Sequence, residues 1–94
     1  MRPYNPLEIT FYPMALRTAE QLRAARAIVR LTQEQVAEGA GISEPSVKRL
    51  EAMTGRLKIR LATLEQLQDF YEGQGLIFID ENGGGPGVRV KKKK

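Results

Sequence analysis

The chain has 94 residues, of which 41% are hydrophobic, so it can form one ordinary globular domain with a modest core. It contains no Cys and no His, which excludes disulfides, thiolate nucleophiles, imidazole bases and the usual zinc sites. No apolar run approaches the roughly 18 residues that span a bilayer, and no signal-peptide pattern precedes the fold. We therefore expect a cytoplasmic protein that binds neither a metal nor a membrane.

The net charge of +4 is concentrated at the C-terminus. Residues 91–94 are all Lys, and the fifteen Lys and Arg residues minus these four equal the eleven Asp and Glu residues. The rest of the chain is neutral but sorted by sign. A basic group comes first, with only Glu51 among its members: Lys48, Arg49, Arg56, Lys58 and Arg60. An acidic group follows: Glu65, Asp69, Glu72, Asp80 and Glu81. A basic face opposite an acidic one favours nucleic-acid binding, and accidental clustering on a solvated surface is the alternative.

Residues 1–13 form an N-terminal extension that is punctuated by three prolines. Within it, Leu7, Ile9 and Phe11 alternate with other residues at the period of a half-buried strand. A strand and a tail are both compatible with this pattern. Met14 is a plausible alternative start, so the extension can be dispensable.

The first helix is predicted to begin at Thr18, whose hydroxyl can cap it while Gln21 reaches back in a capping box. Its apolar stripe consists of Leu22, Ala25 and Val29, and three arginines remain outside this stripe: Arg23, Arg26 and Arg30. Thr32 and Gln35 repeat the capping-box spacing, which predicts that a second helix follows after a short junction.

The segment from Thr32 to Leu50 has the pattern of a complete helix-turn-helix. Residues 33–40 can form one helix, Gly41 can adopt the positive φ of the turn, and Ser43 can cap another helix that runs to about Ala52. The residues expected to pack inward are Val36, Ala37, Ile42, Val47 and Leu50. The residues left on the outside are Glu44, Pro45, Ser46, Lys48 and Arg49, which are short or cationic and suit a DNA groove. Any other two-helix corner with a glycine turn is the alternative.

The sequence LTQEQVAEGAGISEPSVKRLE resembles the Cro and repressor family of phage and bacterial regulators, and the resemblance covers roughly residues 18–73. It implies a DNA-binding bundle of about five helices. By resemblance, Gln33 braces the DNA backbone, and base edges are contacted by Glu44, Ser46 and Lys48, with Arg49 directed toward a base or a phosphate. The flanking basic residues Arg56, Lys58 and Arg60 are expected to bind phosphates.

Two residues depart from the family pattern. Gly39 lies in the last turn of the second helix, where it costs about 1 kcal/mol relative to Ala. Pro45 is tolerated in the first turn of the next helix, but it removes one potential base contact.

The helix-turn-helix domain is expected to span residues 14–75. Residues 54–56 should form a loop or a short helical turn, and Thr63 is predicted to cap a fourth helix that runs to about Glu72. The inward residues of this helix are Leu64, Leu67 and Tyr71, and the glycines at positions 73 and 75 end it.

Residues 76–90 have the pattern of a β-hairpin. Leu76–Ile79 is short, β-branched and aromatic, residues 81–87 form a glycine-rich turn, and residues 88–90 alternate as a second strand. An isolated hairpin is marginal in water, so it must pack on the helices, on residues 7–11 or on a partner chain. Its open edge suits a dimer contact, and a cap on the monomer core is the alternative. Residues 91–94 form a basic tail that is expected to be disordered.

These patterns together predict a mainly α fold, a small helical bundle with a helix-turn-helix and a C-terminal β-hairpin. The expected function is a sequence-specific double-stranded DNA-binding transcription regulator of a phage or bacterium, a repressor that binds a pseudo-palindromic operator as a homodimer. The alternative is an antitoxin or a protein-interaction adaptor built on the same domain. An enzyme is not expected, since the glycines at 83–85 lack the GK[ST] ending of a phosphate loop. No catalytic residue and no cofactor is predicted.

Overall fold

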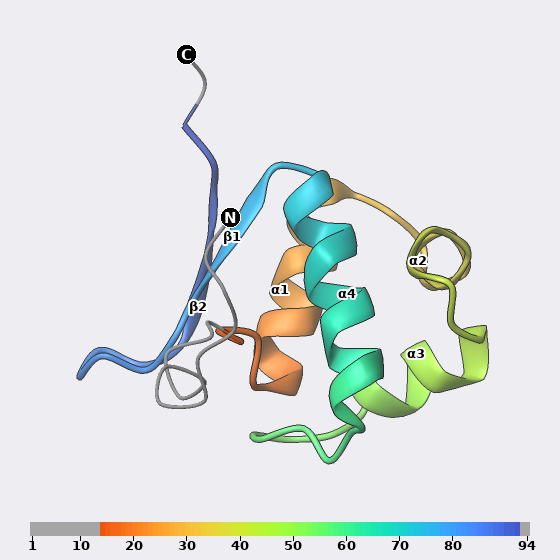
Figure 1. Ribbon diagram of the computed structural model, residues 1–94, viewed down its shortest axis with the longest axis horizontal. Coiled ribbons are helices and arrows are strands. Elements are labelled where there is room, and N and C mark those ends of the chain that lie inside the picture. The colour runs from red at the N-terminus through yellow and green to blue at the C-terminus, as the bar shows by residue number, and fades with distance from the viewer. Residues whose placement is uncertain (1–13, 93–94) are drawn as a thin grey trace, which may run out of the picture.

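The computed structural model describes residues 14–92, which form four helices followed by a two-stranded sheet. The elements are α1 (Ala19–Val29), α2 (Gln33–Ala40), α3 (Glu44–Glu51), α4 (Leu61–Gly73), β1 (Leu76–Ile79) and β2 (Gly87–Val90). Figure 1 shows α1 and α4 at the centre, with the hairpin on one side and α2 and α3 on the other. The mainly α class with a C-terminal hairpin is confirmed. The resemblance implied about five helices, whereas the described residues form four, because the chain becomes extended after α4.

Side-chain caps fix the starts of the first three helices. Thr18 and Gln21 form a capping box at α1, and Thr32 and Gln35 form a second one at α2, as predicted. The Ser43 hydroxyl accepts the Ser46 N–H at 3.2 Å at the start of α3. These caps satisfy N–H groups that an isolated helix leaves unbonded, so the helix boundaries are set by local sequence.

The predicted start of α4 is wrong. Thr63 does not cap this helix, because α4 begins at Leu61 with Arg60 in the N-cap position and without a side-chain cap. The Leu64 N–H donates to the Arg60 carbonyl oxygen at 3.0 Å, which closes the first turn. Leu and Ala are strong helix formers, so Leu61 and the residue after it extend the helix upstream of Thr63.

All four helices and β1 contribute to one hydrophobic core. Its members include Leu22, Ala25, Val36, Val47, Leu50, Leu67, Tyr71, Leu76 and Phe78. Five residues of the helix-turn-helix were predicted to pack inward. Four of them, Val36, Ala37, Val47 and Leu50, are buried, and Ile42 is partly buried against the core. Because the helices are short, this shared apolar burial supplies most of their stability.

Gly39 sits inside α2 for a packing reason. The ring of Phe70 on α4 lies so close to it that a Cβ at this position would collide with the ring. The unfavourable helix propensity of glycine is therefore accepted where α2 and α4 cross closely.

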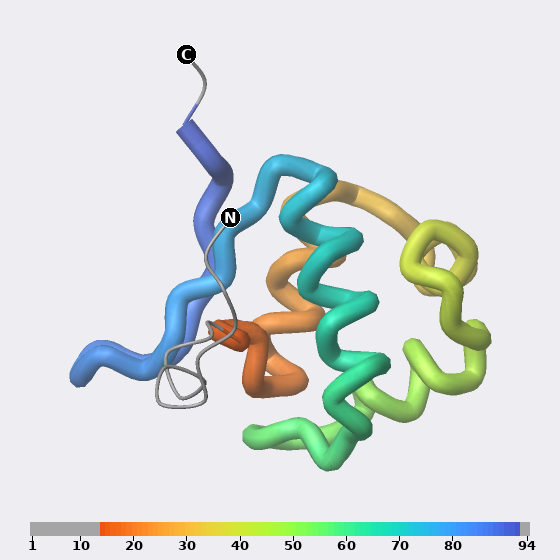
Figure 2. The backbone as a smooth tube through the Cα atoms, viewed as in Figure 1, coloured from red at the N-terminus to blue at the C-terminus, as the bar shows by residue number. Residues whose placement is uncertain are grey.

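The hairpin packs on the helices, which is one of the three packing partners that the sequence analysis considered. β1 and β2 pair antiparallel with Leu76 opposite Val90 and Ile79 opposite Gly87. Figure 2 traces the chain as it turns back after α4, so that β1 packs against α4 and β2 against α1. The side chains of Leu76 and Phe78 on β1 are buried in the core between the hairpin and the helices.

Gln21 joins the hairpin to α1. Its side chain is 2% exposed, and Nε2 donates to the carbonyl oxygens of Ala15 at 3.0 Å, Ile79 at 3.2 Å and Gly87 at 3.1 Å. The tail prediction does not hold for Lys91, whose N–H donates to the Gly75 carbonyl oxygen at 2.7 Å. Residues 1–13, with the predicted strand at 7–11, and residues 93–94 lie outside the described part.

Candidate nucleic-acid interface

The turn between α2 and α3 is built as the sequence predicts. Gly41 adopts φ 75°, and its N–H and that of Ile42 both bond to the Ala37 carbonyl oxygen at 3.0 Å. Ser43 then caps α3 in an extended conformation. A residue with a Cβ adopts this left-handed conformation with difficulty, so glycine sets the angle at which α3 leaves α2.

The outer side of α3 carries the four predicted base-contact residues on two different edges. Glu44 and Lys48 form an ion pair with 3.6 Å between Oε2 and Nζ, and both side chains are more than one-third exposed. An exposed pair of this kind contributes little stability, so a ligand can displace it. Ser46 and Arg49 lie on the other edge, where they line a hollow between α3 and α4.

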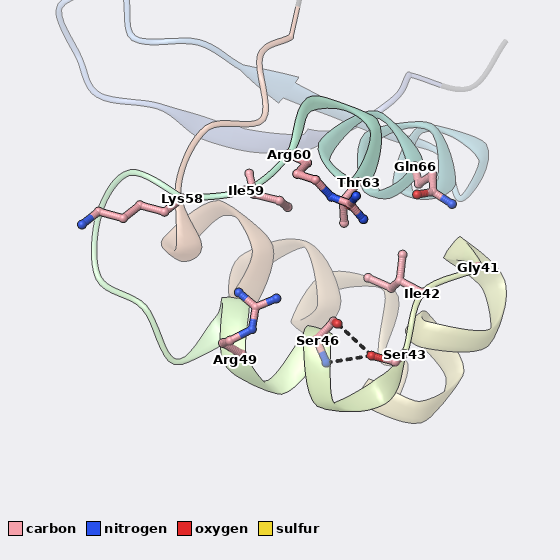
Figure 3. A pocket seen from close by; sticks show the side chains of 10 residues that line it. All are labelled: Gly41, Ile42, Ser43, Ser46, Arg49, Lys58, Ile59, Arg60, Thr63 and Gln66. Carbon is pink, nitrogen blue, oxygen red and sulfur yellow. Dashed lines mark hydrogen bonds between the residues drawn. The ribbon is translucent and has the colours of Figure 1, made fainter.

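This α3–α4 hollow has a volume of about 390 Å³. The turn after α2, α3, the segment before α4 and α4 itself all contribute to its walls (Figure 3). Its polar lining side chains are Ser43, Ser46, Arg49, Lys58, Arg60, Thr63 and Gln66. The hollow therefore presents three cations and three hydroxyl groups, and no lining residue is acidic.

The predicted phosphate-binding residues of the segment before α4 do not all lie in one place. Lys58 and Arg60 line the α3–α4 hollow, together with Arg49. Arg56 lines a second, more apolar hollow of about 250 Å³ with Met14 and Leu61. The structure thus brings two of these three cations beside α3.

Backbone bonds to the N-terminal end of α1 hold the segment that carries these cations. The Ala19 N–H donates to the Gly55 carbonyl oxygen at 2.9 Å, and the Leu57 N–H donates to the Arg17 carbonyl oxygen at 2.8 Å. The Glu20 carboxylate accepts the Gly55 N–H at 3.0 Å, and this bond lowers the pKa of Glu20 below its usual value. The segment is therefore anchored although it has no regular secondary structure.

A buried ion pair that sequence analysis missed ties α3 to α1. Arg26 Nε lies 2.8 Å from Glu51 Oε2, and the Glu51 side chain is only 5% exposed. The hydrogen bond to Glu51 raises the pKa of Arg26. Gln33, predicted to brace a phosphate, donates through Nε2 to Glu51 Oε1 at 3.1 Å. One carboxylate thus links α3 to α1 and to the start of α2.

Arg23 adds a second restraint at the C-terminal end of α3. Its Nη1 donates to the backbone carbonyl oxygens of Glu51 and Met53, groups that the end of a helix leaves without partners. Arg23 and Arg26 were predicted to stay outside the apolar stripe of α1, and their partners were not predicted. The available signal was Glu51, the lone acid within a basic stretch.

The cations of the described residues fall into two groups. Ion pairs join Arg17 to Asp80, Arg23 to Glu20, Arg26 to Glu51 and Lys48 to Glu44. Within residues 14–92, eight basic residues form no ion pair: Arg30, Arg49, Arg56, Lys58, Arg60, Arg89, Lys91 and Lys92. Three of these eight line the α3–α4 hollow, so uncompensated positive charge lies beside α3.

The described part of the chain contains neither a metal-binding cluster nor a helix that could span a membrane. Residues 14–92 contain no cluster of three or more acidic residues arranged to hold a metal ion. No helix there is both long and apolar enough to cross a bilayer.

A family model matches the part of the chain that contains the helices. The model of a family described as a helix-turn-helix domain matches residues 17–75, which include α1 to α4 and end just before β1. No curated protein matches the chain. The match covers more than half of the sequence. It contains the turn between α2 and α3, α3 itself and the basic segment that follows α3.

Proposed function

Because the chain belongs to the helix-turn-helix domain family, we propose that it is a sequence-specific double-stranded DNA-binding transcription regulator that acts as a repressor. The observation that carries the proposal is the exposed side of α3, flanked by the unpaired cations Arg49, Lys58 and Arg60. A helix with a short polar outer side enters the major groove, and flanking cations bind phosphates.

The contacts are assigned by position on α3. Glu44 and Lys48 face outward at its first turns, and with Ser46 and Arg49 they are proposed to contact base edges. Gln33 and the basic residues Arg56, Lys58 and Arg60 are proposed to bind the phosphate backbone.

A dimer on a pseudo-palindromic operator is the proposed assembly. A single short recognition helix contacts few base pairs, so helix-turn-helix domains gain affinity and specificity by binding two half-sites. Val90 at the end of β2 is 61% exposed and lies on a two-stranded sheet with open edges. This side of the molecule is therefore the proposed contact between copies.

Selection from random duplex DNA followed by sequencing tests the function. The proposal expects enrichment of one sequence motif with two inverted half-sites about 10 base pairs apart. A motif without symmetry would retain DNA binding and remove the dimer. A library that shows no enrichment over its starting composition would overturn sequence-specific binding.

A further inference from the structure

We propose that the α3–α4 hollow is a phosphate-binding site, in which Arg49 and Arg60 hold one phosphate group from opposite walls. The inference rests on the proposed DNA-binding function and changes two assignments within it. Arg49, expected at a base edge or a phosphate, and Ser46, expected at a base edge, become phosphate ligands, and Thr63 joins the site. The DNA backbone is the expected source of the phosphate.

The side chains converge from two stretches of the chain, residues 41–49 and residues 58–66. Figure 3 shows Arg49 rising from α3 and Arg60 descending from the start of α4 into the same space, with Thr63 beside Arg60. Ser46 lies near Arg49, and its hydroxyl oxygen is 2.7 Å from that of Ser43. Lys58 points away from these side chains in Figure 3.

The electrostatics of the hollow favour an anion. Its lining contains three cations and no acid, and none of the three forms an ion pair within the described chain. Two guanidinium groups that face one hollow repel each other unless an anion lies between them. The planar fork of Arg matches phosphate oxygens, and Ser and Thr hydroxyls donate to the oxygens that remain.

The size of the hollow fits a phosphodiester. A volume of about 390 Å³ greatly exceeds the roughly 30 Å³ occupied by one water molecule, so the space admits a phosphate with part of its sugars. The surface of the hollow is open, as a strand that passes through the site requires (Figure 3).

Both walls are held in place before any ligand binds. The α3 wall is fixed to α1 by the pair of Arg26 with Glu51, and the opposite wall by the bonds of Gly55 and Leu57 to the start of α1. Preorganised donors lose little conformational freedom on binding, which favours a site over a transient surface contact.

The inference predicts how binding divides between affinity and specificity. A phosphate ligand contributes equally on every sequence, whereas a base contact contributes only on the preferred one. Arg49 should therefore determine affinity without preference, and Glu44 and Lys48 remain on the other edge of α3 to distinguish bases.

The first arm of the test uses inorganic phosphate and no DNA. Amide resonances of the wild-type chain are recorded during titration with phosphate and, separately, with chloride at the same ionic strength. Saturable shifts that phosphate alone produces at Ser46, Arg60 and Thr63 are expected, and Arg49→Gln should abolish them. Arg89→Gln, which removes the same charge from exposed β2, is the control and should leave them intact. Shifts that are absent, or equal with both salts, would overturn the site.

The second arm measures affinity for the selected duplex and for a random duplex at several salt concentrations. Arg49→Gln should weaken both by the same factor and flatten the slope of log affinity against log salt by about 0.9. Thr63→Val, which keeps the shape of the side chain, should weaken both duplexes slightly and equally. A loss confined to the selected duplex would make Arg49 a base contact and overturn the inference.

The two arms separate this inference from the proposed function. If the wild-type chain bound no duplex, DNA binding would fail, and phosphate shifts would then assign the hollow to a free phosphorylated molecule. If it bound DNA and Arg49→Gln changed neither affinity nor slope, the hollow would fail alone. Circular dichroism of each variant confirms that the fold is retained.

Discussion

The helix-turn-helix side and the hairpin side of this domain use their polar side chains differently. On the hairpin side, the Glu81 carboxylate accepts the N–H groups of Gly83 and Gly85, and Asp80 pairs with Arg17. Beside α3, the cations that line the hollow have no acidic partner within the described residues. The Asp80 and Glu81 carboxylates are thus engaged within the fold, whereas the cations that line the hollow remain available to a ligand.

Each side is nevertheless fixed to α1 by one buried polar side chain. Glu51 links α3 to Arg26, and Gln21 links both strands to the start of α1. These two residues are nearly fully buried, so each of them determines the position of structure distant in sequence. The comparison predicts that their removal has different consequences for DNA binding.

Glu51→Ala should have the largest effect. It leaves Arg26 without its partner in a site where the Arg26 side chain is only 30% exposed, and the free energy of unfolding should fall by about 3 kcal/mol. DNA affinity should also fall, because α3 and Gln33 lose their common restraint. Thermal unfolding and duplex titration measure the two losses. The exposed Glu38→Ala variant is the control, and an equally small effect for both would contradict the role of Glu51.

Gln21→Met should have a smaller effect that is confined to stability. It removes the bonds from Nε2 to the hairpin and part of the α1 capping box, which we expect to lower the free energy of unfolding by about 2 kcal/mol. At temperatures where the variant stays folded, its DNA affinity should equal that of the wild type. A loss of affinity as large as that of Glu51→Ala would remove the distinction between the two sides.

Gly39→Ala should destabilise the chain by about 1 kcal/mol or more, although the substitution raises helix propensity by a similar amount. The cause is the collision of the new Cβ with the Phe70 ring. Denaturant unfolding measures the change. In a Phe70→Ala background the same substitution should become stabilising, and continued destabilisation there would disprove the collision as its cause.

Tyr71→Phe should have the smallest effect near neutral pH, within about 0.5 kcal/mol. The Tyr71 hydroxyl is buried and has no hydrogen-bond partner in the described structure, so its loss removes no bond. Burial raises the pKa of Tyr71 above its usual value, so the folded state retains its proton longer than the unfolded state. The wild type should therefore lose stability as pH rises above about 10, and Tyr71→Phe should lose less. Parallel curves of stability against pH would contradict this assignment.

Local signals accounted for the parts of the fold that were predicted. Thr18, Thr32 and Ser43 each cap a helix that begins at the next residue, by accepting the N–H three residues on. Gly41 adopts the positive φ of the turn between α2 and α3. The prediction at Thr63 was wrong because a hydroxyl near the start of a helix is compatible with several starting residues. Here the helix begins two residues earlier, at Leu61.

The candidate site residues could be named from the sequence, but their arrangement in space could not. The cations flanking α3 could be listed from sequence, since charge clusters are visible there. Their division between two hollows depends on how residues 52–60 pass over α1, which no periodicity encodes. The pair of Arg26 with Glu51 spans 25 positions and the contact of Gly39 with Phe70 joins two helices, so both needed the tertiary structure.

The salt dependence of DNA binding tests the central claim, that α3 and the basic residues of the segment before α4 form the DNA interface. Affinity of the wild type and of the combined variant Arg56→Gln, Lys58→Gln, Arg60→Gln is measured on one duplex at several salt concentrations. If these side chains bind phosphates, the slope of log affinity against log salt should flatten by about 0.9 for each, or between 2 and 3 in total, roughly. An unchanged slope in the folded variant would place the DNA on another face of the molecule and contradict the account.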